Sequence, residues 1–235
     1  MKSTFKMLAL AGAMSSLLAG EVQASTLIYT LNQSNVDSVL SDGVNYLTVK
    51  IEDGLAFGTD TNAVKFTVNI LDGVFNFGTH TSYGIQAFGF NQAVGAPTLL
   101  DANIVGPSGW SGNVPNPPNQ FDGFGKFFGA TAGSGVTRFN PLEFWITGVA
   151  GDTASSYAAA SSGNAGQGNA WFAAHVAGFI IDGSAITSGY FGGGNGITPP
   201  PVINVSEVPL PAAAWMLGIG LMAVSSLNRR KSLAT

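Results

Sequence analysis

The residues that could carry out acid–base chemistry are few, because the 235-residue chain contains two histidines, His80 and His175. A Ser-His-Asp hydrolase would also need a serine presented on a tight turn. Serine and aspartate are plentiful, but the sequence GPSGW around Ser108 lacks the Gly-x-Ser-x-Gly pattern of a nucleophile elbow. His175 lies between alanines in an alternating segment, which favours a hydrogen-bonded structural role, and His80 lies near an expected turn. The sequence therefore gives a serine hydrolase no local support.

Carboxylates offer a second kind of chemistry, because two of them flanking a glycosidic bond can hydrolyse it. Between residues 25 and 206 the only glutamates are Glu52 and Glu143, and many aspartates precede a glycine. Aspartate followed by glycine is typical of turns, which explains these aspartates without a metal. No EF-hand or nonapeptide pattern is present, so we expect no cofactor and no metal site; calcium bound by the Asp-Gly loops is the alternative. The Asp-Gly pairs are Asp42-Gly43, Asp53-Gly54, Asp72-Gly73, Asp122-Gly123 and Asp182-Gly183.

One aromatic side chain stands out as a candidate ligand contact. Trp110 lies within GPSGWSGNVPNPPNQ (106–120), a segment rich in glycine and proline that cannot pair as a central strand. An exposed ring in such a loop would suit the face of a sugar. The alternative is a ring that packs down over one end of the fold, and both interpretations remain open from the sequence.

The charge of the central region excludes whole classes of partner. Residues 25–206 carry four basic and eleven acidic side chains, a net charge of −7. Such a surface cannot hold a phosphate backbone by counterion release, so nucleic acid is excluded, and anionic lipid headgroups are equally unfavourable. The basic residues are Lys50, Lys65, Lys126 and Arg138.

Alternation of apolar and polar residues predicts the fold class. It runs through 45–52, 63–71, 141–148 and 169–179, and Asp-Gly turns separate many such segments. Period-two alternation is typical of half-buried antiparallel strands, so we expect an all-β antiparallel β-sandwich or jelly-roll ectodomain. Helical patterns are missing between the strands, except that the segment 155–162 allows either a brief helix or an ordered low-complexity loop. The residues expected to face inward in the first three segments are Leu47, Val49, Ile51, Val64, Phe66, Val68, Ile70, Leu142, Phe144 and Ile146.

The N-terminus has the pattern of a secretory signal peptide. Lys2 and Lys6 precede an apolar stretch over 7–18, and small residues follow at 22–24. This predicts a cleaved signal peptide, with signal peptidase cutting between Ala24 and Ser25. Cysteine is absent, so the exported domain must hold together without disulfides, and thiol catalysis and cysteine-bound zinc are excluded. We expect a signal peptide at 1–24, an ectodomain at 25–191 and a Gly/Pro linker at 192–207.

The C-terminal segment, 208–235, predicts a single transmembrane helix. Residues 212–227 carry no charge, and as a helix they would span about 24 Å, somewhat less than the roughly 30 Å hydrocarbon core. Extension back to Val208 supplies the missing length. The basic residues after the helix fix its orientation, with the tail inside and the ectodomain outside. These residues are Arg229, Arg230 and Lys231.

The same segment resembles a known sorting signal. A VPLPA sequence, a tryptophan three residues later, a short glycine-containing helix and a terminal Arg-Arg-Lys are similar to the PEP-CTERM family, in its variant with leucine where glutamate is commoner. The resemblance covers about the last 25 residues. An ordinary tail anchor is the alternative, but it does not explain the proline motif. The motif residues are Val208, Pro209, Leu210, Pro211, Ala212 and Trp215.

The resemblance implies a function in sorting. It implies a Gram-negative host, recognition by an exosortase, a transient inner-membrane intermediate, and then release or attachment at the cell surface among exopolysaccharide. Segments 121–129 and 171–179 also look like those found before such signals, without implying an activity. We therefore expect a structural or adhesive surface or extracellular-matrix protein of the kind found in biofilms, not an enzyme. A carbohydrate-binding module and a secreted hydrolase are the alternatives.

Overall fold

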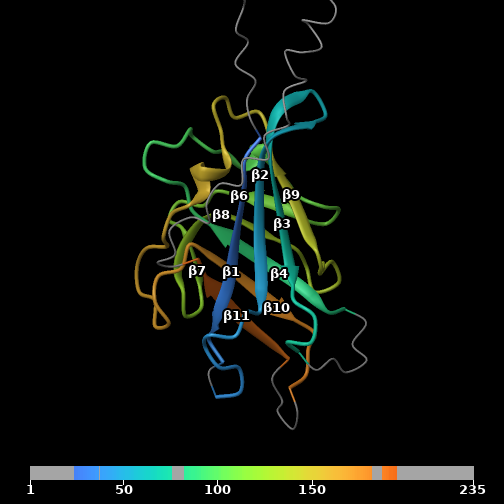
Figure 1. Ribbon diagram of the computed structural model, residues 1–235, viewed down its shortest axis with the longest axis vertical. Helices are drawn as coiled ribbons and strands as arrows, with labels where there is room; N and C mark the ends of the chain where they lie inside the picture. Colours follow the sequence, from blue (N-terminus) through green and yellow to red (C-terminus); the bar gives the residue numbers. More distant parts are fainter. Residues whose placement is uncertain (1–23, 37, 76–81, 182–186, 195–235) are drawn as a thin grey trace, which may run out of the picture.

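The computed structural model describes residues 24–36, 38–75, 82–181 and 187–194, and within them the fold is all-β and antiparallel, as expected (Figure 1). Two short 3₁₀ helices, η1 (Asp101–Asn103) and η2 (Ala154–Tyr157), interrupt the strands, and η2 overlaps the segment where a brief helix or an ordered loop was expected. The strands are β1 (Thr26–Ser34), β2 (Leu47–Phe57), β3 (Asp60–Ile70), β4 (Gly84–Phe90), β5 (Ile104–Val105), β6 (Ser111–Asn113), β7 (Asn119–Phe121), β8 (Gly125–Ala132), β9 (Leu142–Ile146), β10 (Phe172–Ala177) and β11 (Ser188–Gly193).

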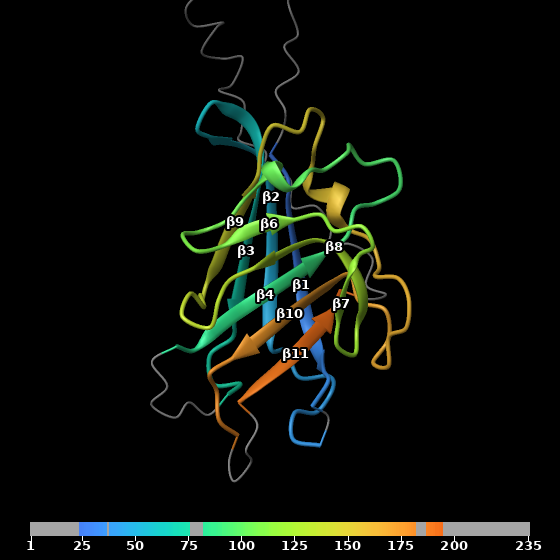
Figure 2. The same cartoon turned by 180° about the vertical axis from the view of Figure 1, so that it is seen from behind.

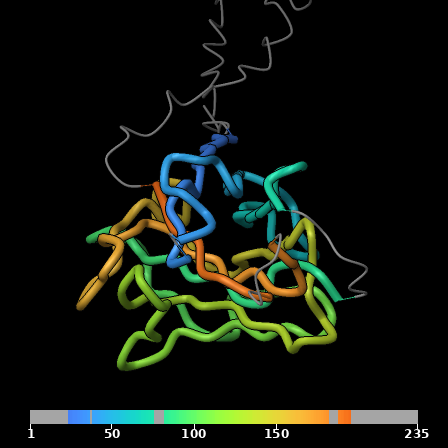
Figure 3. Tube along the Cα trace, turned by 90° about the horizontal axis from the view of Figure 1, so that it is seen from below, coloured from blue at the N-terminus to red at the C-terminus, as the bar shows by residue number. Residues whose placement is uncertain are grey.

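The strands follow one continuous path, in the order β5-β9-β3-β2-β1-β11-β10-β4-β8-β6, with β7 paired to β8 beside it. Seen from behind, β4, β10 and β11 cross in front of β1, β2 and β3 (Figure 2). From below, the N-terminal strands lie on one side and the segment with β6, β7 and β8 lies opposite (Figure 3). The sheet is nearly closed into a barrel. The predicted sandwich or jelly roll is not confirmed, because the two walls belong to one hydrogen-bonded sheet.

The two ends of this path meet at a seam between β5 and β6. A Cβ atom at Gly112 of β6 would clash with the Cβ of Ile104 in β5, so only glycine allows the strands to approach this closely. The backbone N–H of Val114 donates to Oδ1 of Asp101, just before β5, at 2.5 Å. Close packing and a side-chain hydrogen bond thus hold β5 and β6 together, although they are the two ends of the hydrogen-bonded strand order.

The predicted inward-facing residues of β2, β3 and β9 are confirmed. All ten side chains are at most 5 % exposed, and they line the interior together with residues of β1, β4, β10 and β11. The ring of Phe66 in β3 lies at the centre, with ring centroids 4.6 Å from Phe144 of β9, 5.1 Å from Phe90 of β4 and 5.2 Å from Tyr157 of η2. This cluster joins opposite walls of the sheet.

Strand β10 is buried on both faces. Phe172, Ala174 and Val176 face the main core, whereas Ala173 packs in a second apolar cluster on the other face. The segment from β7 to β8 covers this outer face, which is why alternation in β10 does not separate apolar from polar residues. The second cluster comprises Phe121, Phe124, Phe127, Ala130, Ala170 and Ala173.

The Asp-Gly pairs do not all form turns. Gly43, Gly73 and Gly123 lie in turns with positive φ, as expected, and Asp182-Gly183 lies outside the described residues. Asp53-Gly54 was expected to be a turn but lies inside β2, where the pairing register with β3 shifts between Glu52 and Leu55. A glycine at φ +66° allows a bulge, so the strand continues where the sequence indicated a turn.

Phe66→Ala tests the importance of the central aromatic cluster. Removing a fully buried ring that contacts rings from β4, β9 and η2 should lower the free energy of unfolding by about 3–5 kcal/mol. Urea unfolding of the purified protein, followed by tryptophan fluorescence, would measure the change. Val94→Ala, at a fully exposed loop position, is the control and should change stability by less than about 0.5 kcal/mol. A Phe66→Ala loss as small as the control would contradict this account of the core.

Candidate functional site

The predicted sorting signal lies outside the described residues, as do the linker after residue 194, most of the signal peptide and His80. Their sequence-based assignments therefore stay predictions. In the part of the chain that is described, no helix is long and apolar enough to cross a membrane. The residues of the signal so affected are Val208, Pro209, Leu210, Pro211, Ala212, Trp215, Arg229, Arg230 and Lys231.

Trp110 is buried. Its proposed role as a ligand contact required an exposed ring, so the structure does not support that role. The side chain is 9 % exposed and belongs to the main core. Its Nε1–H donates to the backbone oxygen of Thr137 at 2.6 Å, and its ring lies near that of Phe139. The structure thus corresponds to the alternative interpretation, in which the ring packs down over one end of the fold.

His175 lies in a polar hollow of about 320 Å³, but its surroundings favour a neutral, structural side chain. The imidazole stacks on Tyr190 at 4.5 Å between ring centroids. Arg138 lines the same hollow and donates to Oε1 of Gln86 at 3.0 Å and to the backbone oxygen of Ser82 at 2.9 Å. Burial, and then the Arg138 guanidinium, lower the pKa of His175 below its ordinary value. Ser188 also lines the hollow, yet the hydrogen bonds of the described residues include none from a serine to His175.

The two central glutamates do not form a catalytic pair. Glu52 forms an ion pair with Lys50 at 2.9 Å, and Glu143 forms one with Lys65 at 2.7 Å. Each carboxylate is thus engaged by a lysine of its own, and the two glutamates lie on different strands, β2 and β9, so they do not flank one bond as a catalytic pair must. Both pairs lie on the outer face of the sheet, where they make the surface polar.

Two aspartates are buried, at opposite sides of one small polar cluster. Asp53 is 4 % exposed and Asp152 is 8 % exposed. Asp152 accepts hydrogen bonds from the Tyr157 hydroxyl and the backbone N–H of Thr153, and burial raises its pKa. Neither Asp53 nor Asp152 lines the hollow at His175 or a further hollow at the β2–β3 turn. The hydrogen bonds of these carboxylates instead fix the segment that contains η2.

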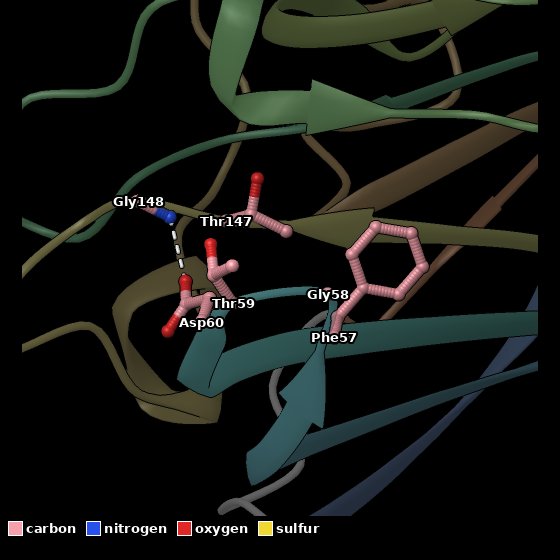
Figure 4. A pocket seen from close by; sticks show the side chains of 6 residues that line it. All are labelled: Phe57, Gly58, Thr59, Asp60, Thr147 and Gly148. Carbon is pink, nitrogen blue, oxygen red and sulfur yellow. Dashed lines mark hydrogen bonds between the residues drawn. The ribbon is translucent and has the colours of Figure 1, made fainter.

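A second hollow, of about 490 Å³, lies at the turn between β2 and β3 (Figure 4). Phe57 pairs with Asp60 across a two-residue connection whose first residue, Gly58, has a positive φ suited to a tight hairpin. Asp60 fixes the turn to the end of β9, because its Oδ2 accepts from the backbone N–H of Gly148 at 2.6 Å. The ring of Phe57 lies at one end of this hollow, and the hydroxyl groups of Thr59 and Thr147 lie at the other.

Phe57, which lines this hollow, belongs to an aromatic pair on the outer face of the sheet. Phe57 stacks on Trp145 with centroids 4.7 Å apart and planes 28° apart, and both side chains are partly exposed. The Nζ atom of Lys65 lies 5.6 Å from the Trp145 ring centroid while it also pairs with Glu143. We define the aromatic hollow as Phe57, Thr59, Asp60, Thr147 and the backing ring of Trp145. Flat apolar rings beside hydroxyl and carboxylate groups can hold a sugar, which has one apolar face and a polar rim.

Sequence reasoning missed the aromatic hollow, although a signal for it existed. Trp145 falls on the outward phase of the alternating segment 141–148, between buried Phe144 and Ile146. A large aromatic ring on a solvent-facing phase marks a surface that can bind something. Phe57 gave no comparable signal, because it follows the bulge at Asp53-Gly54.

Comparison with known proteins adds no further assignment. No family model, no curated protein and no solved structure matches this chain. Across the described ranges, no group of three or more histidine, aspartate or glutamate side chains lies close enough to hold a metal ion. What the chain does must therefore be argued from its own residues.

The neutral state of His175 gives a pH dependence with a definite sign. Because its folded-state pKa is lowered from 6.5, the unfolded chain takes up a proton first as the pH falls. The free energy of unfolding should therefore decline from about pH 7 downward until the folded-state pKa is passed. The decline should be about 1.4 kcal/mol for each pH unit that separates the folded-state pKa from the unfolded-state pKa.

His175→Gln should remove this part of the decline, as measured by urea unfolding at a series of pH values. The raised pKa of Asp152 makes the free energy of unfolding rise as the pH falls, which opposes the effect of His175. Asp152 is present in both the unaltered protein and the variant, so the difference between their pH profiles isolates His175. An equally steep decline in the variant would show that His175 titrates freely.

Proposed function

We propose that the chain is an exported bacterial surface or extracellular-matrix protein, sorted by an exosortase and structural or adhesive among exopolysaccharide. The C-terminal arrangement of VPLPA, a marginal apolar helix and Arg-Arg-Lys supports the sorting step. The predicted signal peptide at 1–24 supports export, after which the protein would pass through an inner-membrane intermediate to the surface. The folded part supports a binding role more than catalysis. Each of its two glutamates forms an ion pair with a lysine, and its buried aspartates line neither hollow.

The proposed adhesive activity is that of a carbohydrate-binding module, and the aromatic hollow is its proposed site. The observation that carries this proposal is a partly exposed Phe57 ring, backed by Trp145, beside the side chains of Thr59, Asp60 and Thr147. The net charge of −7 over residues 25–206 disfavours an acidic polymer. A neutral polysaccharide, bound through ring faces and hydroxyl groups, suits this surface best.

Phe57→Ala tests the binding site. The loss of one stacking ring should weaken binding by about two- to tenfold, since such ring contacts contribute about 0.5–1.5 kcal/mol. Affinity electrophoresis through gels containing dextran, xylan or a soluble β-glucan would measure this, with alginate as the acidic comparison. Phe57→Tyr keeps the ring and should keep binding.

Phe128→Ala is the matched control, because Phe128 is an aromatic residue of β8 that is 40 % exposed. It should bind as the unaltered protein does. The proposal is wrong if Phe57→Ala and Phe128→Ala are retarded equally, or if none of the neutral polysaccharides retards the unaltered protein.

Pro209→Ala together with Pro211→Ala tests the sorting step. Proline restricts its own φ and disfavours helix at the residue before it. The motif is thus expected to be extended just outside the membrane, where a transpeptidase can reach it. In the double variant the helix can extend through the motif, so unprocessed protein should accumulate in the inner membrane of the native host. Immunoblots of membrane and surface fractions would follow this.

Loss of the host's exosortase should cause the same accumulation. A Ser206→Ala variant, just before the motif, is the control and should be processed normally. Processing of the double variant at the unaltered rate would mean that the motif only begins a helix and that the chain is simply membrane-anchored.

A further inference from the structure

The carboxylate of Asp53 is held by the residue at which the mature chain is expected to begin. Its Oδ1 accepts from the backbone nitrogen of Ser25 at 2.5 Å, and its Oδ2 accepts from the Ser25 hydroxyl at 2.5 Å. Oδ2 also accepts from the backbone N–H of Ala154, the first residue of η2, at 2.8 Å. Asp53 thus connects the start of the first strand, the bulge in β2 and a distant loop.

This carboxylate is buried without a positive partner. It is 4 % exposed, and the ion pairs among the described residues are Lys50–Glu52 and Lys65–Glu143. A second buried acid, Asp152, lies near enough for the negative charge of Asp53 to help raise its pKa. Hydrogen bonds from Ser25 and Ala154 hold the carboxylate, and neither ion pair of the described residues includes it.

The backbone around Asp53 is shaped to receive residues 24 and 25. The N–H of Asp53 donates to the backbone oxygen of Ser25 at 3.1 Å, just beyond the β1–β2 pairing of Thr26 with Glu52. At Gly54 a Cβ atom would lie 3.2 Å from the Cα of Ala24, so glycine leaves room for the chain to pass. Ala24 itself is exposed.

We propose that cleavage between Ala24 and Ser25 creates a cationic partner for Asp53. Hydrolysis of this peptide bond by one water molecule places a hydroxyl on the Ala24 carbonyl carbon and a hydrogen on the Ser25 nitrogen. At neutral pH the new amine binds a further proton and becomes an α-ammonium. The Ser25 nitrogen lies 2.5 Å from Oδ1 of Asp53 in the structure, so an ammonium at this position forms a partly buried ion pair with Asp53. Maturation therefore adds an ion pair to the hydrogen bonds that already join β1, the β2 bulge and η2.

The unprocessed chain has the hydrogen bonds to Asp53 but lacks the ion pair. Before cleavage the Ser25 nitrogen is an amide, which donates a single hydrogen and carries no charge. The inference rests on the proposed export, because it requires signal peptidase to cut after Ala24. The inference extends that proposal, because cleavage after Ala24 would stabilise the folded domain as well as release it.

Amine labelling of the full mature protein tests the ion pair directly. The exported protein would be treated under native conditions with an acetylating reagent, and the Ser25 peptide would be followed by mass spectrometry. We expect the Ser25 amine of the unaltered protein to react about tenfold or more slowly than that of Asp53→Asn, since each pKa unit changes the reactive fraction tenfold. Lys50, whose side chain is 41 % exposed, is the internal control and should react at one rate in both.

Unfolding of matched chains supplies a second readout that does not depend on export. Residues 25–235 and 24–235 would be compared in one detergent, each with Asp53 and with Asp53→Asn. Retaining Ala24 displaces the charge from the carboxylate, so it should lower the melting temperature by several degrees with Asp53 and leave it unchanged with Asp53→Asn. Asp122→Asn, at an exposed acid, is the control and should behave as the unaltered protein.

The outcomes separate the two proposals. A mature terminus other than Ser25 in the exported protein would contradict the proposed cleavage, while the matched chains would still test the ion pair. Equal labelling of Ser25 in the unaltered protein and Asp53→Asn, or equal melting of the two chain lengths with Asp53, would overturn the inference. If Asp53→Asn does not fold, the two chain lengths with native Asp53 decide alone.

Discussion

Aromatic packing across the interior is the interaction on which the rest of this fold depends. The chain has no cysteine, so no disulfide can join one side of the sheet to the other. At the seam the terminal strands β5 and β6 contribute only two and three residues and are paired with other strands. What joins the walls is the contact of Phe66 with rings from β4, β9 and η2. The aromatic hollow and the Asp53 cluster both lie on strands that this core positions.

Alternation in the sequence predicted which side chains face inward, but not what they face. Val49, Phe66 and Phe144 fell on the inward phase and are fully buried. The same pattern is produced by two sheets packed together and by one sheet curled on itself, because period two reports only one strand at a time. The choice between them depends on which strands pair, and those pairings join residues as distant as Leu31 and Gly193.

The candidate sites were harder to predict because they depend on packing between segments. Trp110 lies in a loop of a kind that often exposes its side chains, yet Thr137 offers a backbone oxygen that draws its ring into the core. Asp53-Gly54 has the composition of a turn, but a bulge lets β2 continue and buries the aspartate. Phe57 and Trp145 come together only through the pairing of β3 with both of their strands. None of these contacts is local in sequence, so no short pattern could reveal them.

The position of β11 has a consequence for how the domain is made. Among the described residues, the last strand, β11, lies between the first strand, β1, and β10, so residues 188–193 complete the middle of the sheet. Topologies dominated by such distant pairings have a high contact order and fold in milliseconds to seconds rather than microseconds. The ribosome synthesises β1 long before β11. During that interval the edge of β1 that will pair with β11 has no partner strand. This strand order thus delays closure of the sheet until nearly all of the described domain has been synthesised.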